Sequence, residues 1–143
     1  MSQAKLRILF VEDEEAAYVG LKAILMHLGH TVDVAETADQ AVAFMQKTAY
    51  DLLLLDIMID PGTVLNGVIR RAAGKELLLR LRSGQLGPLQ TRSDVPTVAI
   101  TAVADLGLYT ALKGAEVEII LPKPIDPEDA LQRIPHVMER EMV

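Results

Sequence analysis

Five polar side chains in this sequence directly follow, or come shortly after, short apolar stretches. Glu12 and Asp13 follow one stretch, Asp56 a second, Thr101 a third and Lys123 a fourth. Two carboxylates about 5 Å apart repel each other by roughly 3 kcal/mol at an effective dielectric constant near 20. A cluster of the three carboxylates would therefore need a counter-charge.

A divalent cation is the counter-charge that this residue set favours. The candidate side-chain ligands are oxygens and the sequence contains no cysteine, which favours magnesium or manganese over softer metals. With such a cation in place, Asp56 could attack a phosphorus atom. Lys123 and the Thr101 hydroxyl could then bind the transferred oxygens. The pattern predicts phosphoryl transfer to a carboxylate.

The elements that would hold these residues are predicted from hydrophobic patterning. Segments with helical spacing of apolar residues alternate with short apolar or β-branched runs. This alternation predicts one α/β domain over residues 1–143, a doubly wound five-stranded parallel sheet with helices on both faces. Ligands of such sheets bind outside the carboxyl ends of the strands, which is where all five polar residues would lie. The expected strands are residues 7–11, 31–35, 51–55, 97–100 and 117–121.

Composition and charge exclude several classes of protein. The chain has 143 residues, half of them hydrophobic, which is enough for a buried core. Its net charge of −6 disfavours binding to nucleic acid or to an anionic membrane. The N-terminal apolar run is too short for a signal peptide or a membrane span, so we expect a cytoplasmic protein.

The segment 58–96 is longer than a usual connection in an α/β fold. Within it, an Asn-Gly pair between apolar residues predicts a small β-hairpin near residues 63–70. A mobile loop is the alternative. The same segment contains a basic stretch that we interpret as the solvated face of a helix. This stretch comprises Arg70, Arg71, Lys75, Arg80 and Arg82.

The order of the motifs ILFVEDEE, DLLLLDIM, VAITA and ILPKPID resembles the receiver domain of bacterial two-component response regulators, over almost the whole chain. The resemblance is to a stand-alone type without an output domain. It implies a flavodoxin-like receiver fold, from which this sequence departs by its enlarged loop after the third strand. It also implies a signalling protein whose chemistry is limited to its own phosphorylation and dephosphorylation, rather than an enzyme with a separate substrate.

The resemblance assigns roles to individual residues. Asp56 corresponds to the phosphoacceptor, and Glu12 and Asp13 to the acidic pair that holds Mg²⁺. Met58 would offer its backbone carbonyl to the same ion. Thr101 corresponds to the switch hydroxyl, with Ala102 leaving room beside it. Lys123 corresponds to the lysine that pairs with the phosphate, and its bond to the following proline is cis in the family.

The implied partners are a sensor histidine kinase or a phosphotransfer protein as donor, and a downstream target protein. The chain could also form a homodimer. The apolar residues that would form its interface are Ile119, Leu121 and, near the C-terminus, Val137, Met138, Met142 and Val143. The sequence departs from the family at Ile120, where an aromatic residue usually stands. This departure leaves open a pseudo-receiver, an interaction module that does not use phosphorylation. A separate alternative is an aspartate-nucleophile phosphatase. The latter class carries its nucleophile after the first strand, not the third.

Overall fold

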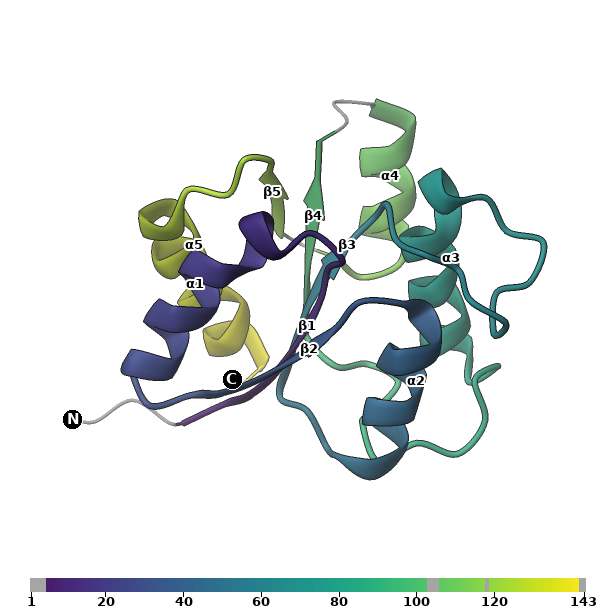
Figure 1. Cartoon of the computed structure of the whole chain (residues 1–143), viewed down its shortest axis with the longest axis horizontal. Coiled ribbons are helices and arrows are strands. Elements are labelled where there is room, and N and C mark those ends of the chain that lie inside the picture. Colours follow the sequence, from purple (N-terminus) through teal and green to yellow (C-terminus); the bar gives the residue numbers. More distant parts are fainter. Residues whose placement is uncertain (1–4, 103–105, 118, 142–143) are drawn as a thin grey trace.

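The computed structural model describes residues 5–102, 106–117 and 119–141, and the side chains of these residues except 106 and 135–141. Its centre is one parallel sheet in the order β2-β1-β3-β4-β5 (Figure 1). The strands are β1 (Arg7–Val11), β2 (Thr31–Ala35), β3 (Leu52–Asp56), β4 (Thr97–Thr101) and β5 (Ile119–Pro122). The predicted fold class is confirmed, and each strand overlaps its predicted range.

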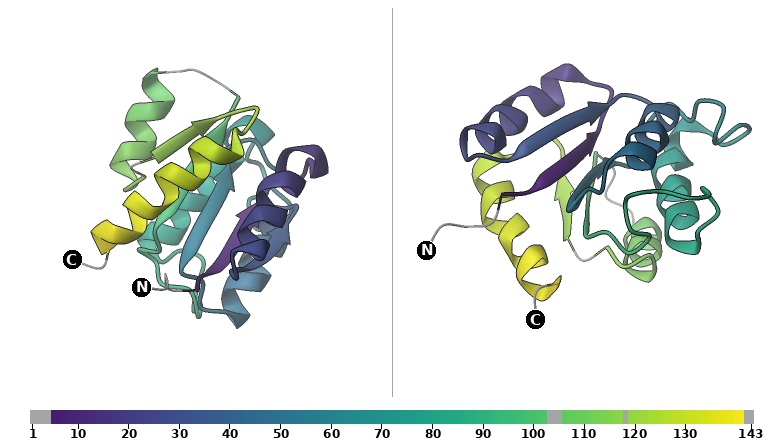
Figure 2. Two further views of the ribbon diagram at one scale, coloured as in Figure 1. Left: turned by 90° about the vertical axis from the view of Figure 1, so that its left-hand side faces the viewer. Right: turned by 90° about the horizontal axis from the view of Figure 1, so that it is seen from below.

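Helices cover both faces of this sheet. On one face lie α1 (Glu15–His27) and α5 (Pro127–Glu141). On the other lie α2 (Ala38–Lys47), α3 (Arg70–Ser83) and α4 (Leu106–Gly114). Figure 2 shows this three-layer arrangement from two further sides. None of the helices in the described ranges is long and apolar enough to span a membrane.

The strands are buried on both faces because their apolar runs are nearly continuous. Alternate residues of one strand therefore enter different cores. Ile8 and Phe10 pack in the cluster with α1 and α5, whereas Leu9 and Val11 pack in the cluster with α2, α3 and α4. Burial of both faces fixes the register of the strands. The register in turn sets where each strand ends relative to its neighbours.

The segment after β3 is not the predicted hairpin. Residues 62–67 form turns, and no strand lies within 63–70. The hydrogen bonds there are local: the backbone N–H of Leu65 donates to the Pro61 carbonyl at 3.2 Å, and that of Val68 to the Leu65 carbonyl at 2.9 Å. Leu65 is fully buried in the core on the α3 side, so the apolar residues beside the Asn-Gly pair pack on the domain rather than across a hairpin.

A carboxylate from another element holds these turns. Asp39, in the first turn of α2, accepts hydrogen bonds from the backbone N–H groups of Thr63 at 2.9 Å and Val64 at 2.7 Å. It also accepts one from the Thr63 hydroxyl at 2.9 Å. These bonds lower the pKa of Asp39 below its ordinary value. The loop is thus tied to α2 by charge-assisted hydrogen bonds, a long-range contact that outweighs the local hairpin preference.

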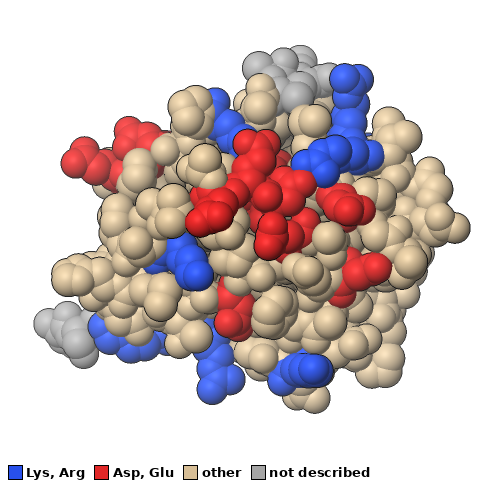
Figure 3. Space-filling view, viewed as in Figure 1, with Lys and Arg blue, Asp and Glu red and all other residues tan. Residues whose placement is uncertain are grey.

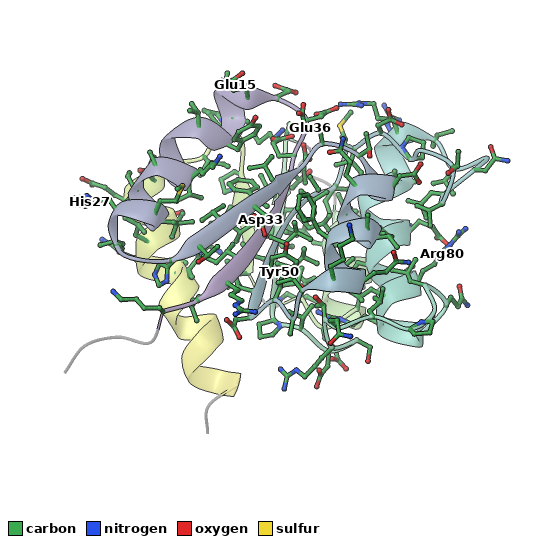
Figure 4. The ribbon with its side chains drawn as sticks, turned by 60° about the horizontal axis from the view of Figure 1, so that its bottom comes forward. Glu15, His27, Asp33, Glu36, Tyr50 and Arg80 are labelled. Carbon is green, nitrogen blue, oxygen red and sulfur yellow. The ribbon has the colours of Figure 1, made fainter. Side chains whose placement is uncertain are left out.

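Two arginines of α3 are half-buried and donate hydrogen bonds to backbone carbonyls, so the solvated-face interpretation of the basic stretch is wrong for them. Arg82 donates to the carbonyls of Ser93 and Val95, both at 2.8 Å. Arg80, which is labelled in Figure 4, donates to the Val64 carbonyl at 3.0 Å. A partly buried hydrogen bond ties β2 to the start of β3, where the Tyr50 hydroxyl donates to Asp33 at 2.6 Å; both residues are labelled in Figure 4. The arginine contacts fix the connections on both sides of α3.

Candidate functional site

The three predicted carboxylates lie together at the carboxyl end of the sheet. Glu12, Asp13 and Asp56 each offer an oxygen atom, and these atoms all lie within 4.8 Å of one another. Glu12 is fully buried and Asp56 nearly so, whereas the Asp13 side chain is 20% exposed. The cluster is therefore open to solvent through Asp13. Figure 3 shows acidic side chains gathered over this end of the sheet, with basic ones beside them.

Strand pairing brings these residues together. β1 pairs with both β2 and β3, and the backbone N–H of Glu12 continues the ladder by donating to the Ala35 carbonyl at 2.9 Å. Asp56 is the last residue of β3, next to Ile100 of β4. Asp13 precedes α1, which begins at Glu15, so it is not the cap of that helix. The strand ends thus place the carboxylates side by side.

Helix α3 packs directly on the end of β3 at Gly74. The Gly74 backbone N–H donates to the Ile57 carbonyl at 2.9 Å. A Cβ atom at this position would lie 2.4 Å from the Asp56 carbonyl oxygen and 2.5 Å from the Ile57 Cα. Only glycine allows this approach, which fixes the backbone of the central carboxylate.

Lys123 reaches the same cluster from the residue after β5. Its Nζ atom donates to Asp56 Oδ2 at 2.8 Å and lies 2.5 Å from Glu12 Oε1 as an ion pair without hydrogen-bond geometry. Its backbone N–H donates to the Thr101 carbonyl at 2.9 Å, which continues the β4·β5 pairing. The Lys123–Pro124 peptide bond is cis, as the resemblance implies.

Burial and the ammonium group set the protonation of this cluster. Burial, together with the hydrogen bond and the charge of Asp56, raises the pKa of Glu12 to about 7, although Lys123 acts in the opposite direction. Burial lowers the pKa of Lys123, but its contacts with Asp56 and Glu12 outweigh that effect and raise it above its ordinary value. Lys123 is therefore a fixed positive charge at neutral pH.

The two other predicted residues border the cluster. Thr101 is the last residue of β4 and is 2% exposed. Met58 lies two residues after Asp56, and its backbone N–H donates to Asp56 Oδ1 at 3.0 Å. That bond orients the Asp56 carboxylate. The roles of Thr101 as a switch and of the Met58 carbonyl as a metal ligand stay predictions.

The chemistry of the donor set fits magnesium. All the clustered donors are carboxylate oxygens, which are the ligands that hard cations prefer. One oxygen of Asp13, Oδ1, is buried and has no hydrogen-bond partner. A buried, unpartnered carboxylate oxygen is costly unless an ion or water satisfies it. The cluster therefore has the composition and the unsatisfied oxygen expected of a divalent-cation site.

One residue at the cluster, Arg70, was not predicted from the sequence to lie there. Arg70, the first residue of α3, forms an ion pair with Asp13 through its Nη2 atom. This contact raises the pKa of the guanidinium. Arg70 is exposed, as the solvated-face interpretation predicts, but that interpretation did not include its contact with Asp13. The only sequence signal was its place at the start of the helix that follows Asp56, close to the carboxyl edge of the sheet.

Comparison with known proteins identifies what this arrangement is similar to. Residues 8–135 match the model of the response regulator receiver domain family. The chain is 29% identical to the response regulator MprA of Mycobacterium leprae over 135 residues, which are 94% of this chain and 52% of that protein. It thus spans about half the length of the curated relatives that it matches.

Solved structures agree with the family match. A CheY-like response regulator receiver domain from Methanospirillum hungatei JF-1 aligns with a TM-score of 0.75 and 25% identity, covering 97% of this chain and 98% of the other. The receiver domain of the sensor histidine kinase PA1611 from Pseudomonas aeruginosa PAO1 aligns with a TM-score of 0.70 and 24% identity, covering 95% and 99%. That second structure has a magnesium ion coordinated in its active-site cleft.

Proposed function

Because the chain belongs to the response regulator receiver domain family of two-component systems, we propose that it accepts a phosphoryl group onto Asp56. The observation that carries this proposal is the contact of Lys123 with Asp56 inside a cluster of three carboxylates. That contact places a fixed positive charge beside the one carboxylate that ends a central strand. The family match also argues against the phosphatase alternative.

The proposed reaction is a group transfer between two side chains. An oxygen of Asp56 forms a bond to phosphorus, and the phosphorus–nitrogen bond of a donor phosphohistidine breaks. The Met58 N–H holds Asp56 Oδ1, so Oδ2, which faces Lys123, is the oxygen best placed to react. Lys123 can then move from the carboxylate to the new phosphoryl oxygens without leaving the site.

Magnesium would be held by Glu12, Asp13, Asp56 and the Met58 carbonyl, and when bound it supplies positive charge for the transferred group. The magnesium ion in the Pseudomonas aeruginosa receiver structure supports this assignment. The Asp13 oxygen without a partner supports it independently.

We further propose a sensor histidine kinase or a phosphotransfer protein as donor, acting in the cytoplasm, and a target protein as receiver of the signal. Output is expected on the surface around α4, β5 and α5, which would also carry a homodimer. Ile120 is half-buried against the core on the α4 side. Residues 103–105, Met142 and Val143 lie outside the described residues, as do the side chains of Val137 and Met138, so this surface stays a prediction.

Phosphorylation by acetyl phosphate tests the proposed function. The wild-type chain should give a retarded band on a phosphate-affinity gel when Mg²⁺ is present and no retarded band with EDTA. Asp56→Asn should give none under either condition. Asp60→Asn is the matched control, because Asp60 follows the same strand but is exposed and contributes no oxygen to the cluster.

Two results would contradict the proposal. A wild-type chain that gives no retarded band would be a pseudo-receiver. Phosphate mapped by mass spectrometry to a residue other than Asp56 would show that the nucleophile is wrongly assigned.

A further inference from the structure

Two positively charged side chains contact the acidic cluster, and they contact different carboxylates. Lys123 contacts Glu12 and Asp56. Arg70 contacts Asp13, the remaining carboxylate. Every predicted metal ligand with a charged side chain therefore already has a positively charged neighbour.

The two cations differ in how firmly they are held. The Lys123 side chain is 15% exposed and contacts two carboxylates that are almost fully buried. The Arg70 side chain is 46% exposed and contacts only the most exposed of the three carboxylates. Exposed ion pairs contribute little free energy because water and salt screen them. Arg70 is thus the cation that can leave at low cost.

The position of Arg70 allows its side chain to leave without moving α3. The helix is fixed by the hydrogen bond from Gly74 to Ile57, about one turn after Arg70. The Ala72 N–H donates to the Ile69 carbonyl at 3.0 Å, which fixes the first turn. The backbone of Arg70 is therefore held, while its long side chain reaches Asp13 through solvent-exposed space.

We infer that Arg70 is a displaceable counter-ion of the acidic cluster: it occupies Asp13 in the metal-free protein and leaves when a divalent cation binds there. Arg70 thereby lowers the affinity for Mg²⁺ and sets the concentration at which the site fills. The inference rests on the proposed function, because it takes Asp13 to be a ligand of the cation.

Charge balance supports displacement rather than coexistence. A divalent cation bound at the cluster favours the ionised form of all three carboxylates, Glu12 included. Against their three negative charges, Lys123 and Arg70 together leave one uncompensated. A divalent cation added beside Arg70 would reverse the sign of the cluster, whereas a divalent cation that replaces Arg70 makes it neutral. Asp13 Oδ2 is the oxygen that Arg70 contacts, and it would be released for the cation together with the unpartnered Oδ1.

Magnesium titration by calorimetry tests this inference on the full chain. Arg70→Gln should bind Mg²⁺ about three- to tenfold more tightly than the wild type at low salt, because no resident cation competes. This difference should shrink at 0.5 M NaCl, where the ion pair is screened. Arg71→Gln is the matched control, because it removes the same charge one residue away and Arg71 is exposed. Its affinity should stay close to that of the wild type.

A second measurement follows the side chain itself. In ¹⁵N-edited NMR spectra the guanidinium signal missing from Arg70→Gln identifies Arg70. In the wild type this signal should shift toward the position of a free arginine as Mg²⁺ is added.

The outcomes separate the inference from the proposed function. If the wild type binds Mg²⁺ and Arg70→Gln binds it no more tightly, Arg70 does not compete and the inference is wrong. If Arg70→Gln and Arg71→Gln tighten binding equally, the effect is one of general charge, and displacement is again wrong. If neither the wild type nor Arg70→Gln binds Mg²⁺, the metal assignment of the proposed function is overturned, and the inference with it.

Discussion

Replacing Gly74 with alanine should destabilise the domain, although alanine is normally the better residue in a helix. Gly74 lies inside α3, where its backbone contacts the end of β3. The new Cβ would lie 2.4 Å from the Asp56 carbonyl oxygen and 2.5 Å from the Ile57 Cα, closer than van der Waals contact permits. Because both are backbone atoms of a buried strand end, α3 must move outward to make room.

The expected cost follows from two opposing effects. The better helix propensity of alanine contributes about 0.5–1 kcal/mol of stability. Overpacking of a well-packed contact costs roughly 1–3 kcal/mol, and the rigid neighbours favour the upper part of that range. The net loss should be about 1–2 kcal/mol. For a chain of this size, that lowers Tm by roughly 3–6 °C.

Gly20 provides the matched control. It also lies inside a helix, α1, but apart from its chain neighbours and the nearby backbone of its own helix, no atom lies within 4 Å of the Cβ that an alanine would place there. Gly20→Ala should therefore raise the stability by about 0.5–1 kcal/mol through helix propensity alone. The two variants should change the urea midpoint, followed by circular dichroism, in opposite directions.

The same variants connect packing with the site. Because Gly74 contacts the backbone of Asp56, Gly74→Ala should also slow phosphorylation by acetyl phosphate, whereas Gly20→Ala should not. If Gly74→Ala were as stable as Gly20→Ala and were phosphorylated at the wild-type rate, the close approach of α3 to β3 would not exist as described. The backbone of Asp56 would then not be fixed by α3.

Two further predictions concern stability and pH. Asp39→Ala should cost about 1–2 kcal/mol and expose the amides of Thr63 and Val64 to hydrogen exchange, because three hydrogen bonds to one carboxylate are lost. The pKa of Asp39 is lowered in the folded state, so in the wild type this contribution is present above its ordinary value of 3.8 and is lost as the pH falls through the lower, folded value. His30 accepts a hydrogen bond from the Leu6 N–H through Nδ1, and burial, with the charge of Lys5, lowers its pKa. The folded state therefore favours neutral His30. The contribution of His30 to the free energy of unfolding should be lost as the pH falls below its ordinary pKa of 6.5. Urea titrations at pH 7.5 and 5 should show a weaker pH dependence for His30→Gln than for the wild type.

Each of these predictions has a control within the chain. Asp60 accepts a single hydrogen bond in the same loop, from Gly62, so Asp60→Ala should cost less than Asp39→Ala. An equal cost would mean that the Asp39 bonds do not hold the turns. His27 is exposed, and His27→Gln makes the same replacement without removing a described hydrogen bond. If His30→Gln changed the pH dependence no more than His27→Gln does, the His30 bond would not contribute to folding.

The apolar runs were sufficient to predict the sheet and the place of the site. Strands buried on both faces need continuous apolar sequence, and parallel strands all end at the same edge. The polar residues that follow the apolar runs are therefore predicted to lie at this edge without any knowledge of long-range contacts. Glu12, Asp56 and Lys123 meet in the structure for this reason.

Tertiary structure alone decided the segment after β3 and the contacts of the arginines. The Asn-Gly pair is a local hairpin signal. However, Asp39, which lies more than twenty positions earlier in the sequence, binds the same segment, and Leu65 is buried in the core. Likewise, Arg70 and Arg71 are adjacent and identical in type, yet only Arg70 contacts Asp13 among the described ion pairs. The direction in which α3 leaves the loop decides which of them faces the cluster. That direction depends on packing between elements distant in the sequence, which local residue preferences do not encode.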